Sequence, residues 1–139
     1  GNMFTLTTRI DRLEHYPDGH GAIIDYKTGG VPGSSDIAQG YANQLPLEAL
    51  IVQEGQVQQP IDKSQSITQL EYWRLAGNET HCEIIPINAS LEETNERLRT
   101  LLMRFVNPSQ PYTTTQDPSQ TLRYNDYTHL TRRQEWEGI

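Results

Sequence analysis

The chain of 139 residues has one cysteine, Cys82, and no long hydrophobic run. A single cysteine excludes an internal disulfide, an iron–sulfur cluster held by four cysteines and a cysteine-based zinc site. No stretch approaches the roughly 20 consecutive apolar residues that a membrane-spanning helix needs, and no signal peptide is visible. We therefore expect a soluble, cytoplasmic protein with no membrane contact.

Basic residues are also few, with 11 Lys and Arg against 18 Asp and Glu and a formal net charge of −7. This balance argues against free-standing nucleic-acid binding, because neutralisation of phosphates supplies most non-specific affinity. Any DNA substrate would have to be delivered by attached domains or partner subunits, or be met by a local basic strip. The residues available for such a strip are Arg9, Arg12, Lys27 and Arg74, and the sequence leaves both possibilities open.

The length predicts a single domain over residues 1–139. Residues 1–2 are typical of an expression scar ahead of a native segment. Residues 107–123 are typical of a linker, and residues 124–139 contain enough aromatic and leucine side chains to dock as a closing segment.

The first part of the chain predicts a β-hairpin. Residues 4–16 and 21–28 are rich in β-branched and aromatic side chains. Residues 17–19 between them, with the sequence Pro-Asp-Gly, form a turn signal in which Gly19 is free to take a positive φ.

The length of the hairpin loop sets which acidic residues face each other. With a three-residue loop Tyr16 faces His20, and counting outward places Asp11 directly opposite Asp25. A four-residue loop instead places Asp11 diagonal to both Asp25 and Lys27. Asp25 and Lys27 share a face in either case, because side chains alternate along a strand.

Two carboxylates opposed on a partly buried sheet are costly unless something offsets their repulsion and desolvation. Mg²⁺ can do so, because it binds one or two carboxylates and takes further ligands from water and phosphate. Lys27 beside the ion could orient or deprotonate an attacking water, so Asp11, Asp25 and Lys27 suggest a metal-dependent phosphodiesterase. The alternative is an exposed hairpin whose acids are paired by Arg9, Arg12 or Lys27.

A helical stretch is expected from about residue 36 to residue 54. Pro46 either kinks it or lies in the first turn of a second helix capped by Asn43. Gln44 and Glu48 are four residues apart and therefore share a side of an otherwise apolar helix.

The second half of the chain predicts two strands and a helix. Residues 66–75 alternate as a strand in which Ile67 faces away from Leu70 and Tyr72, and residues 82–87 form another after a turn at 77–78. Ser90 begins a capping box, so residues 90–106 form a helix, whose arginines Arg97, Arg99 and Arg104 are expected on a solvated face.

Three segments together resemble a known family: residues 4–12, residues 23–29 with the sequence I-I-D-Y-K-T-G, and residues 44–49 with the sequence Q-L-P-L-E-A. They resemble the RecB-like branch of the PD-(D/E)xK nuclease superfamily, in particular the carboxy-terminal nuclease domain of AddB subunits of bacterial AddAB helicase–nucleases. The tail, residues 124–132 with Glu135 and Trp136, is similar to the end of that subunit.

The resemblance implies an α/β fold, with a restriction-endonuclease-like core of a small mixed sheet flanked by helices. It implies Asp11 and Asp25 as metal-binding acids, the Tyr26 carbonyl as a further ligand, Lys27 as the catalytic lysine and Gln44 as a residue near the active site. The implied cofactor is Mg²⁺, with Mn²⁺ as a substitute, and the implied partners are DNA and an AddA-like subunit. The implied task is to cut DNA during processing of double-strand breaks for recombinational repair.

The sequence departs from the family pattern at two places. Relatives commonly have a tyrosine where this chain has Glu48, and they carry a histidine or acid on a helix before the first strand, which is absent from this segment. The latter implies a partial nuclease domain with an incomplete metal site. Two alternatives therefore remain: a nuclease fold used for scaffolding or DNA guidance without catalysis, and an unrelated interaction module with an acidic surface hairpin.

Overall fold

The computed structural model describes residues 4–54, 66–75 and 82–111. The chain divides into two compact units, Gly1–Val106 and Asn107–Ile139, and all the helices and strands described below belong to the first. The expected expression scar, the turn at 77–78, most of the linker and the whole docking segment lie outside the described residues.

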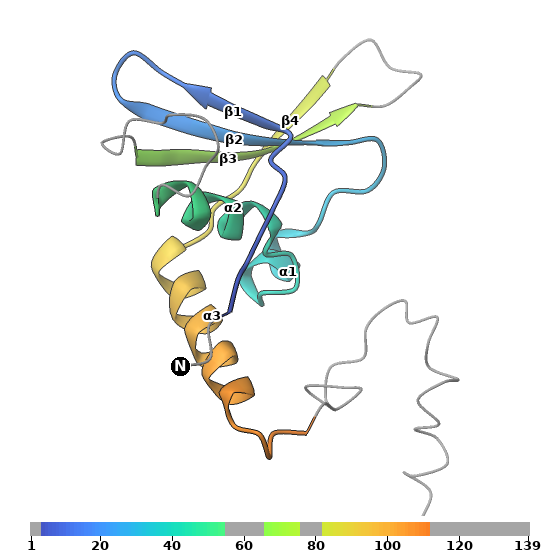
Figure 1. Cartoon of the computed structure of the whole chain (residues 1–139). Helices are drawn as coiled ribbons and strands as arrows, with labels where there is room; N and C mark the ends of the chain where they lie inside the picture. The colour runs from blue at the N-terminus through green and yellow to red at the C-terminus, as the bar shows by residue number, and fades with distance from the viewer. Residues whose placement is uncertain (1–3, 55–65, 76–81, 112–139) are drawn as a thin grey trace, which may run out of the picture. The chain divides into compact units, whose positions relative to one another are not determined.

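The centre of the first unit is a four-stranded sheet with the order β1-β2-β3-β4 (Figure 1). Its strands are Arg12–His15 (β1), His20–Lys27 (β2), Ser66–Leu75 (β3) and Cys82–Pro86 (β4). β1 pairs with β2 and β3 with β4 in antiparallel fashion, whereas β2 and β3 are parallel. A parallel pair requires a crossover, and two helices lie in the connection. The predicted mixed α/β sheet is confirmed.

The hairpin between β1 and β2 has the three-residue loop. Gly19 has a φ of +87°, the Tyr16 amide donates to the His20 carbonyl at 2.8 Å, and the Gly19 amide donates to the Tyr16 carbonyl at 3.0 Å. The ladder pairs Arg12 with Ile24, so one further step places Asp11 opposite Asp25. Of the two registers left open by the sequence, the structure has the first.

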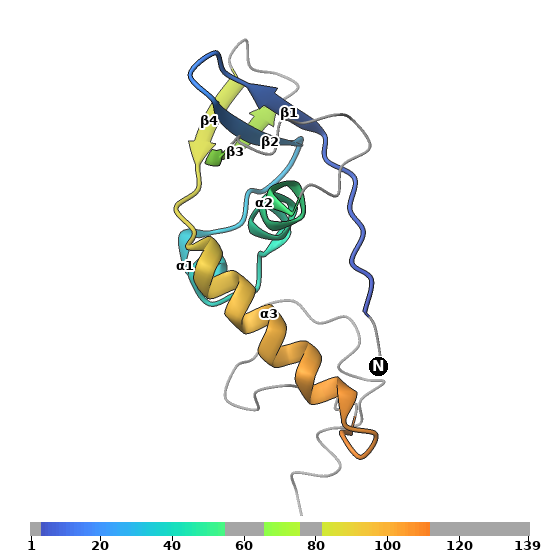
Figure 2. The ribbon, with the colours of Figure 1, turned by 60° about the vertical axis from the view of Figure 1, so that its left-hand side comes forward.

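The first strand is shorter than the prediction of residues 4–16, because β1 begins only at Arg12. In the observed register, residues 4–10 would have to pair with residues 26–32. That stretch contains Gly29 and Gly30, which disfavour a strand, and Pro32, which has no amide proton to donate. Residues 4–10 therefore leave the sheet and run past the helices (Figure 2).

The predicted helix over residues 36–54 is two helices, α1 (Ser34–Ala38) and α2 (Gln44–Gln53). Gly40 separates them with a φ of +82°, in the left-handed region that glycine adopts without strain. Asn43 is the N-cap residue of α2 and Pro46 lies in its first turn, where the missing amide proton costs nothing. The second of the two alternatives for Pro46 is therefore correct as to its position, although the side chain of Asn43 makes no capping hydrogen bond.

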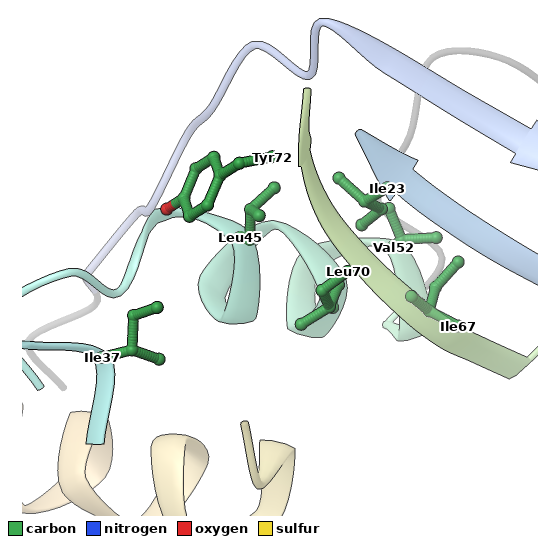
Figure 3. Packing of buried hydrophobic residues seen from close by; sticks show 8 residues of the cluster. Ile23, Ile37, Leu45, Val52, Ile67, Leu70 and Tyr72 are labelled. Atoms are coloured by element: carbon green, nitrogen blue, oxygen red, sulfur yellow. The ribbon is translucent and has the colours of Figure 1, made fainter. Parts of the chain in front are cut away.

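The core lies between α2 and one face of the sheet (Figure 3). The strands β2 and β3 and the helices α1 and α2 supply the hydrophobic side chains of this core cluster, which are Ile23, Ile37, Leu45, Ala49, Val52, Ile67, Leu70 and Tyr72. We call this side of the sheet the covered face, and the opposite side the open face, because none of the described helices packs on it.

One prediction about β3 was wrong. Ile67 faces the core together with Leu70 and Tyr72 instead of pointing away from them. The register shows why: Gly21 pairs with Ile67 but Ala22 pairs with Gln69, which leaves Thr68 as an extra residue in a bulge. A bulge of one residue resets the alternation of side chains.

The last helix, α3 (Leu91–Val106), begins as predicted, since Ser90 Oγ accepts a hydrogen bond from the Glu93 amide at 3.2 Å. Arg97, Arg99 and Arg104 are exposed, which confirms the predicted solvated face. Arg97 also donates to the Ala38 carbonyl at 2.9 Å, so it joins α3 to the end of α1. None of the helices described in the structure is long and apolar enough to cross a membrane.

Candidate active site

Asp25 is a buried carboxylate on the inner strand β2. Its relative exposure is 3%, and its side chain projects from the covered face toward the first turn of α2. Asp25 Oδ1 accepts a hydrogen bond from Gln44 Nε2 at 2.7 Å, and Asp25 Oδ2 lies 2.7 Å from Lys27 Nζ in an ion pair. A buried carboxylate is tolerated only with such partners, so Asp25 depends on both neighbours.

Lys27 completes a closed arrangement with these two residues. It follows Asp25 by two positions, and strand alternation places both side chains on the covered face. Lys27 Nζ donates to Gln44 Oε1 at 3.3 Å and lies 5.4 Å from the centre of the Tyr72 ring. Asp25, Lys27 and Gln44 therefore contact one another in pairs, and we call them the site triad.

Asp11 lies beside this triad rather than within it. Its Oδ2 accepts a hydrogen bond from the main-chain amide of Tyr26 at 3.2 Å, at the point where β1 begins. The Tyr26 side chain points the other way, to the open face, where its hydroxyl accepts from Arg12 and its ring meets Trp73 edge-on at 6.0 Å. Only the main chain of Tyr26 thus adjoins the site.

Glu48 is a further buried acid that the sequence analysis did not assign to the site. It lies one turn after Gln44, has 2% exposure, and accepts hydrogen bonds at Oε1 from Gln44 Nε2 at 3.3 Å and from Thr8 Oγ1 at 3.0 Å. Burial raises the pKa of Glu48, the two hydrogen bonds oppose the rise, and the nearby charges of Asp25 and Asp11 add to it. The sequence feature that could have identified Glu48 is its spacing of four residues from Gln44, which places two polar side chains on one side of an otherwise apolar helix.

The donor set has the chemistry that Mg²⁺ prefers, but it is not a complete protein cage. In the part of the chain that the structure describes, no three His, Cys, Asp or Glu side chains gather closely enough to hold a metal ion. Asp25 Oδ2 is nevertheless a buried oxygen without a hydrogen bond, with Lys27 as its ion-pair partner. Mg²⁺ commonly uses one or two carboxylates together with water and substrate phosphate, so Asp11 and Asp25 fit such an ion.

The basic strip suggested by the sequence is divided between the two faces of the sheet at Arg12 and Lys27. Arg12 projects from the open face, where it pairs with Glu14 and lies 5.1 Å from the centre of the Trp73 ring. Lys27 projects from the covered face, and Arg74 pairs with Glu83 on β4. Arg12 and Lys27 therefore lie on opposite faces of the sheet, and Arg12 and Arg74 are each paired with an acid, so these three side chains do not present one positive surface.

Comparison with known proteins gives one informative match. No curated protein and no solved structure matches the chain significantly. The family model described as the PD-(D/E)XK nuclease superfamily matches residues 1–127, which is most of the 139 residues and includes Asp11, Asp25, Lys27, Gln44 and Glu48. The chain therefore belongs to the PD-(D/E)XK nuclease superfamily.

Proposed function

We propose that this domain is a Mg²⁺-dependent phosphodiesterase that cleaves DNA. Membership of a nuclease superfamily supports the class of reaction and the class of substrate. The single observation that supports catalysis by this chain is the site triad. It holds a buried carboxylate, an ammonium group and an amide in mutual contact at the end of β2.

Asp11 and Asp25 are the proposed metal-binding acids, and the Tyr26 carbonyl is a proposed further ligand. Both acids offer hard oxygen atoms, and Asp25 Oδ2 is a buried oxygen that makes no hydrogen bond. When bound, Mg²⁺ would polarise the scissile phosphate and lower the pKa of a coordinated water, and Mn²⁺ is expected to substitute for it.

Lys27 is the proposed catalytic lysine. Its ammonium group is held by Asp25 and Gln44 and lies against a buried aromatic ring, where electrostatic interactions are stronger than in water. In this position it can orient the attacking water and stabilise negative charge that develops on the phosphate oxygens. Gln44 contributes by holding Asp25 and Lys27 in fixed relative positions through both ends of one amide group.

The biological setting that we propose is a helicase–nuclease of the AddAB type that processes double-strand breaks for recombinational repair. The chain would then be the nuclease part of an AddB-like subunit, working with an AddA-like partner. The net charge of −7 supports this setting, because an acidic nuclease domain holds DNA weakly and needs other domains or subunits to deliver it.

A second candidate function is a nuclease fold that guides DNA or serves as a scaffold without cleaving it. The observation in its favour is that, among the described residues, no three His, Cys, Asp or Glu side chains lie close enough together to hold a metal ion. In this case Lys27 would act only as the structural counter-ion of Asp25.

The test compares Mg²⁺-dependent cleavage of DNA by the wild type, Asp25→Asn and Lys27→Met. The assay should use this chain and the longer AddB-like protein from which we propose it derives. Each substitution is expected to lower the cleavage rate by at least about 100-fold, because even an outer partner of a metal ligand contributes about 10–100-fold.

Two matched controls belong to this experiment. Asp18→Asn changes an exposed acid in the hairpin loop, and Arg99→Met removes an exposed cation on α3. Both controls are expected to cleave like the wild type. Equal cleavage by all five proteins would reject the catalytic assignment. Cleavage by none of them, with DNA binding retained, would favour the guiding role.

A further inference from the structure

We propose that Glu48 is a positioning residue, which fixes the orientation of the Gln44 amide and through it the geometry of Asp25 and Lys27. The inference rests on the proposed function, because it assigns a role in the same site. Glu48 does not contact Asp25 or Lys27 through a hydrogen bond, and its influence passes through Gln44.

The Gln44 amide can face two ways, and its neighbours decide between them. In the structure Gln44 Nε2 donates to two carboxylates, Asp25 at 2.7 Å and Glu48 at 3.3 Å, while Gln44 Oε1 accepts from Lys27. A rotated amide would point its oxygen at both acids and its NH₂ group at an ammonium group, which has no lone pair to accept a hydrogen bond. Glu48 thus adds a second acceptor on the side where Asp25 already lies.

The consequence reaches the oxygen that we assign to the metal ion. Gln44 occupies Asp25 Oδ1, which leaves Oδ2 toward Lys27 and without a hydrogen bond. If Gln44 lost its orientation, Asp25 could rotate and both of its oxygens would be available to Lys27. Glu48 therefore acts on the ion site by keeping the two carboxylate oxygens of Asp25 in different roles.

Glu48 is itself held in place from the N-terminal segment. Thr8 Oγ1 donates to the same Oε1 atom at 3.0 Å, although residues 4–10 have no strand partner. A series of contacts therefore runs from Thr8 to Glu48, then to Gln44, and finally to Asp25 and Lys27.

Packing does not account for a carboxylate at this position. The neighbours of Glu48 along α2 include Leu45, Ala49 and Val52, all of which are buried in the core. A leucine would suit this surface better, since a buried carboxylate is desolvated and its charge lies near those of Asp25 and Asp11. An acid that burial disfavours, in contact with a site residue, points to a role in the site.

The test measures two quantities in Glu48→Leu, Glu48→Gln and the control Glu54→Gln, which changes an exposed acid next to the end of the same helix. The first quantity is the pair of side-chain amide signals of Gln44, observed by NMR without metal. The second is the affinity for Mg²⁺ and Mn²⁺, measured by calorimetric titration.

We expect Glu48→Leu to shift and broaden the Gln44 signals and to weaken ion binding about 10–100-fold. Glu48→Gln keeps a carbonyl acceptor, so it should give intermediate values, and Glu54→Gln should match the wild type. In a Gln44→Leu background, Glu48→Leu should cause no further loss, because a residue that acts through Gln44 has nothing left to position.

Unchanged Gln44 signals and unchanged ion affinity in Glu48→Leu would overturn the proposal, as would additive losses in the double variant. If the wild type bound no ion, the proposed function would fail, but the Gln44 signals would still decide the positioning role. If Glu48→Leu did not fold, Thr8→Val would serve instead, with the exposed neighbour Thr7→Val as its control. Thr8→Val should change the Gln44 signals in the same direction by a smaller amount, and no change would count against the proposal.

Discussion

Acidic side chains differ in burial and in their partners between the two faces of the sheet. On the covered face, the acids Asp25 and Glu48 are almost fully buried and share one set of contacts with Lys27 and Gln44. On the open face, Glu14 lies near water and is paired locally with Tyr16 and Arg12.

The direction of the pKa shifts follows from this difference. Burial raises the pKa of Glu48 on the covered face. The hydrogen bond from Tyr16, followed by that from Arg12, lowers the pKa of Glu14 on the open face. The pKa values of the two glutamates thus shift in opposite directions, because desolvation is the largest cause for Glu48, whereas hydrogen bonds from two donors outweigh desolvation for Glu14. Of these two glutamates, only the one on the covered face has a pKa raised above its ordinary value.

Gly21→Ala tests the dense packing of the covered face and should have the largest effect on stability among the following variants. An added Cβ would lie 2.9 Å from Ile67 Cδ1 and 3.0 Å from the main-chain oxygen of Glu14. We expect a loss of about 1–3 kcal/mol in the free energy of unfolding, measured by urea denaturation, because a closely packed site cannot expand freely.

Gly30→Ala is the matched control for this variant, since an added Cβ there meets nothing within 4 Å. It should change the free energy of unfolding by no more than about 0.5 kcal/mol. Similar free energies of unfolding for Gly21→Ala and Gly30→Ala would mean that the covered face can accommodate an added methyl group at Gly21 and is not densely packed there.

Glu48→Gln sharpens the comparison through the pH dependence of stability. Because the pKa of Glu48 is raised in the folded state above its ordinary value of 4.5, folding favours the protonated form. Its contribution to stability is fully present below the unfolded-state pKa and is lost as the pH rises through the higher folded-state pKa. The free energy of unfolding of the wild type, relative to Glu48→Gln, should therefore fall over this interval and then level off.

Urea denaturation at a series of pH values from about 4 upward would measure this difference, with Glu54→Gln as the control for a general effect of removing one charge. A constant difference between wild type and Glu48→Gln across the series would contradict burial of an ionisable acid on the covered face.

Tyr26→Phe should have the smallest effect, because it alters only the open face. It removes the hydroxyl that accepts a hydrogen bond from Arg12, and the free energy of unfolding should change by no more than about 0.5 kcal/mol. DNA cleavage and Mg²⁺ affinity should match the wild type, since the proposed contribution of Tyr26 comes from its main chain. A tenfold loss of cleavage would show that the open face takes part in the reaction.

Local patterns in the sequence predicted the parts of the fold that depend on near neighbours. The Pro-Asp-Gly turn and strand alternation predicted the hairpin, and they placed Asp25 and Lys27 on one face. The capping signal at Ser90 likewise predicted the start of α3. These features depend on residues close in sequence, so the chain specifies them without knowledge of distant contacts.

Errors arose where a distant partner decides the local structure. The length of β1 depends on where β2 leaves the sheet, and the direction of Ile67 depends on a bulge formed against Gly21 and Ala22. The role of Glu48 depends on Thr8, which lies 40 residues earlier in the chain. No local pattern around any of these residues contains that information.

The sequence by itself determined the chemical inventory and its spacing: two acids, a lysine two residues after the second acid, and a glutamine on the following helix. The tertiary structure decided that Lys27 and Gln44 take different oxygens of Asp25, that Asp11 stands beside the Tyr26 amide, and that Glu48 joins them. The physical reason is that these polar side chains lose their contact with water only when the helix layer packs on the sheet. The helix α2 has to cover the sheet before these polar groups lose water and must satisfy one another.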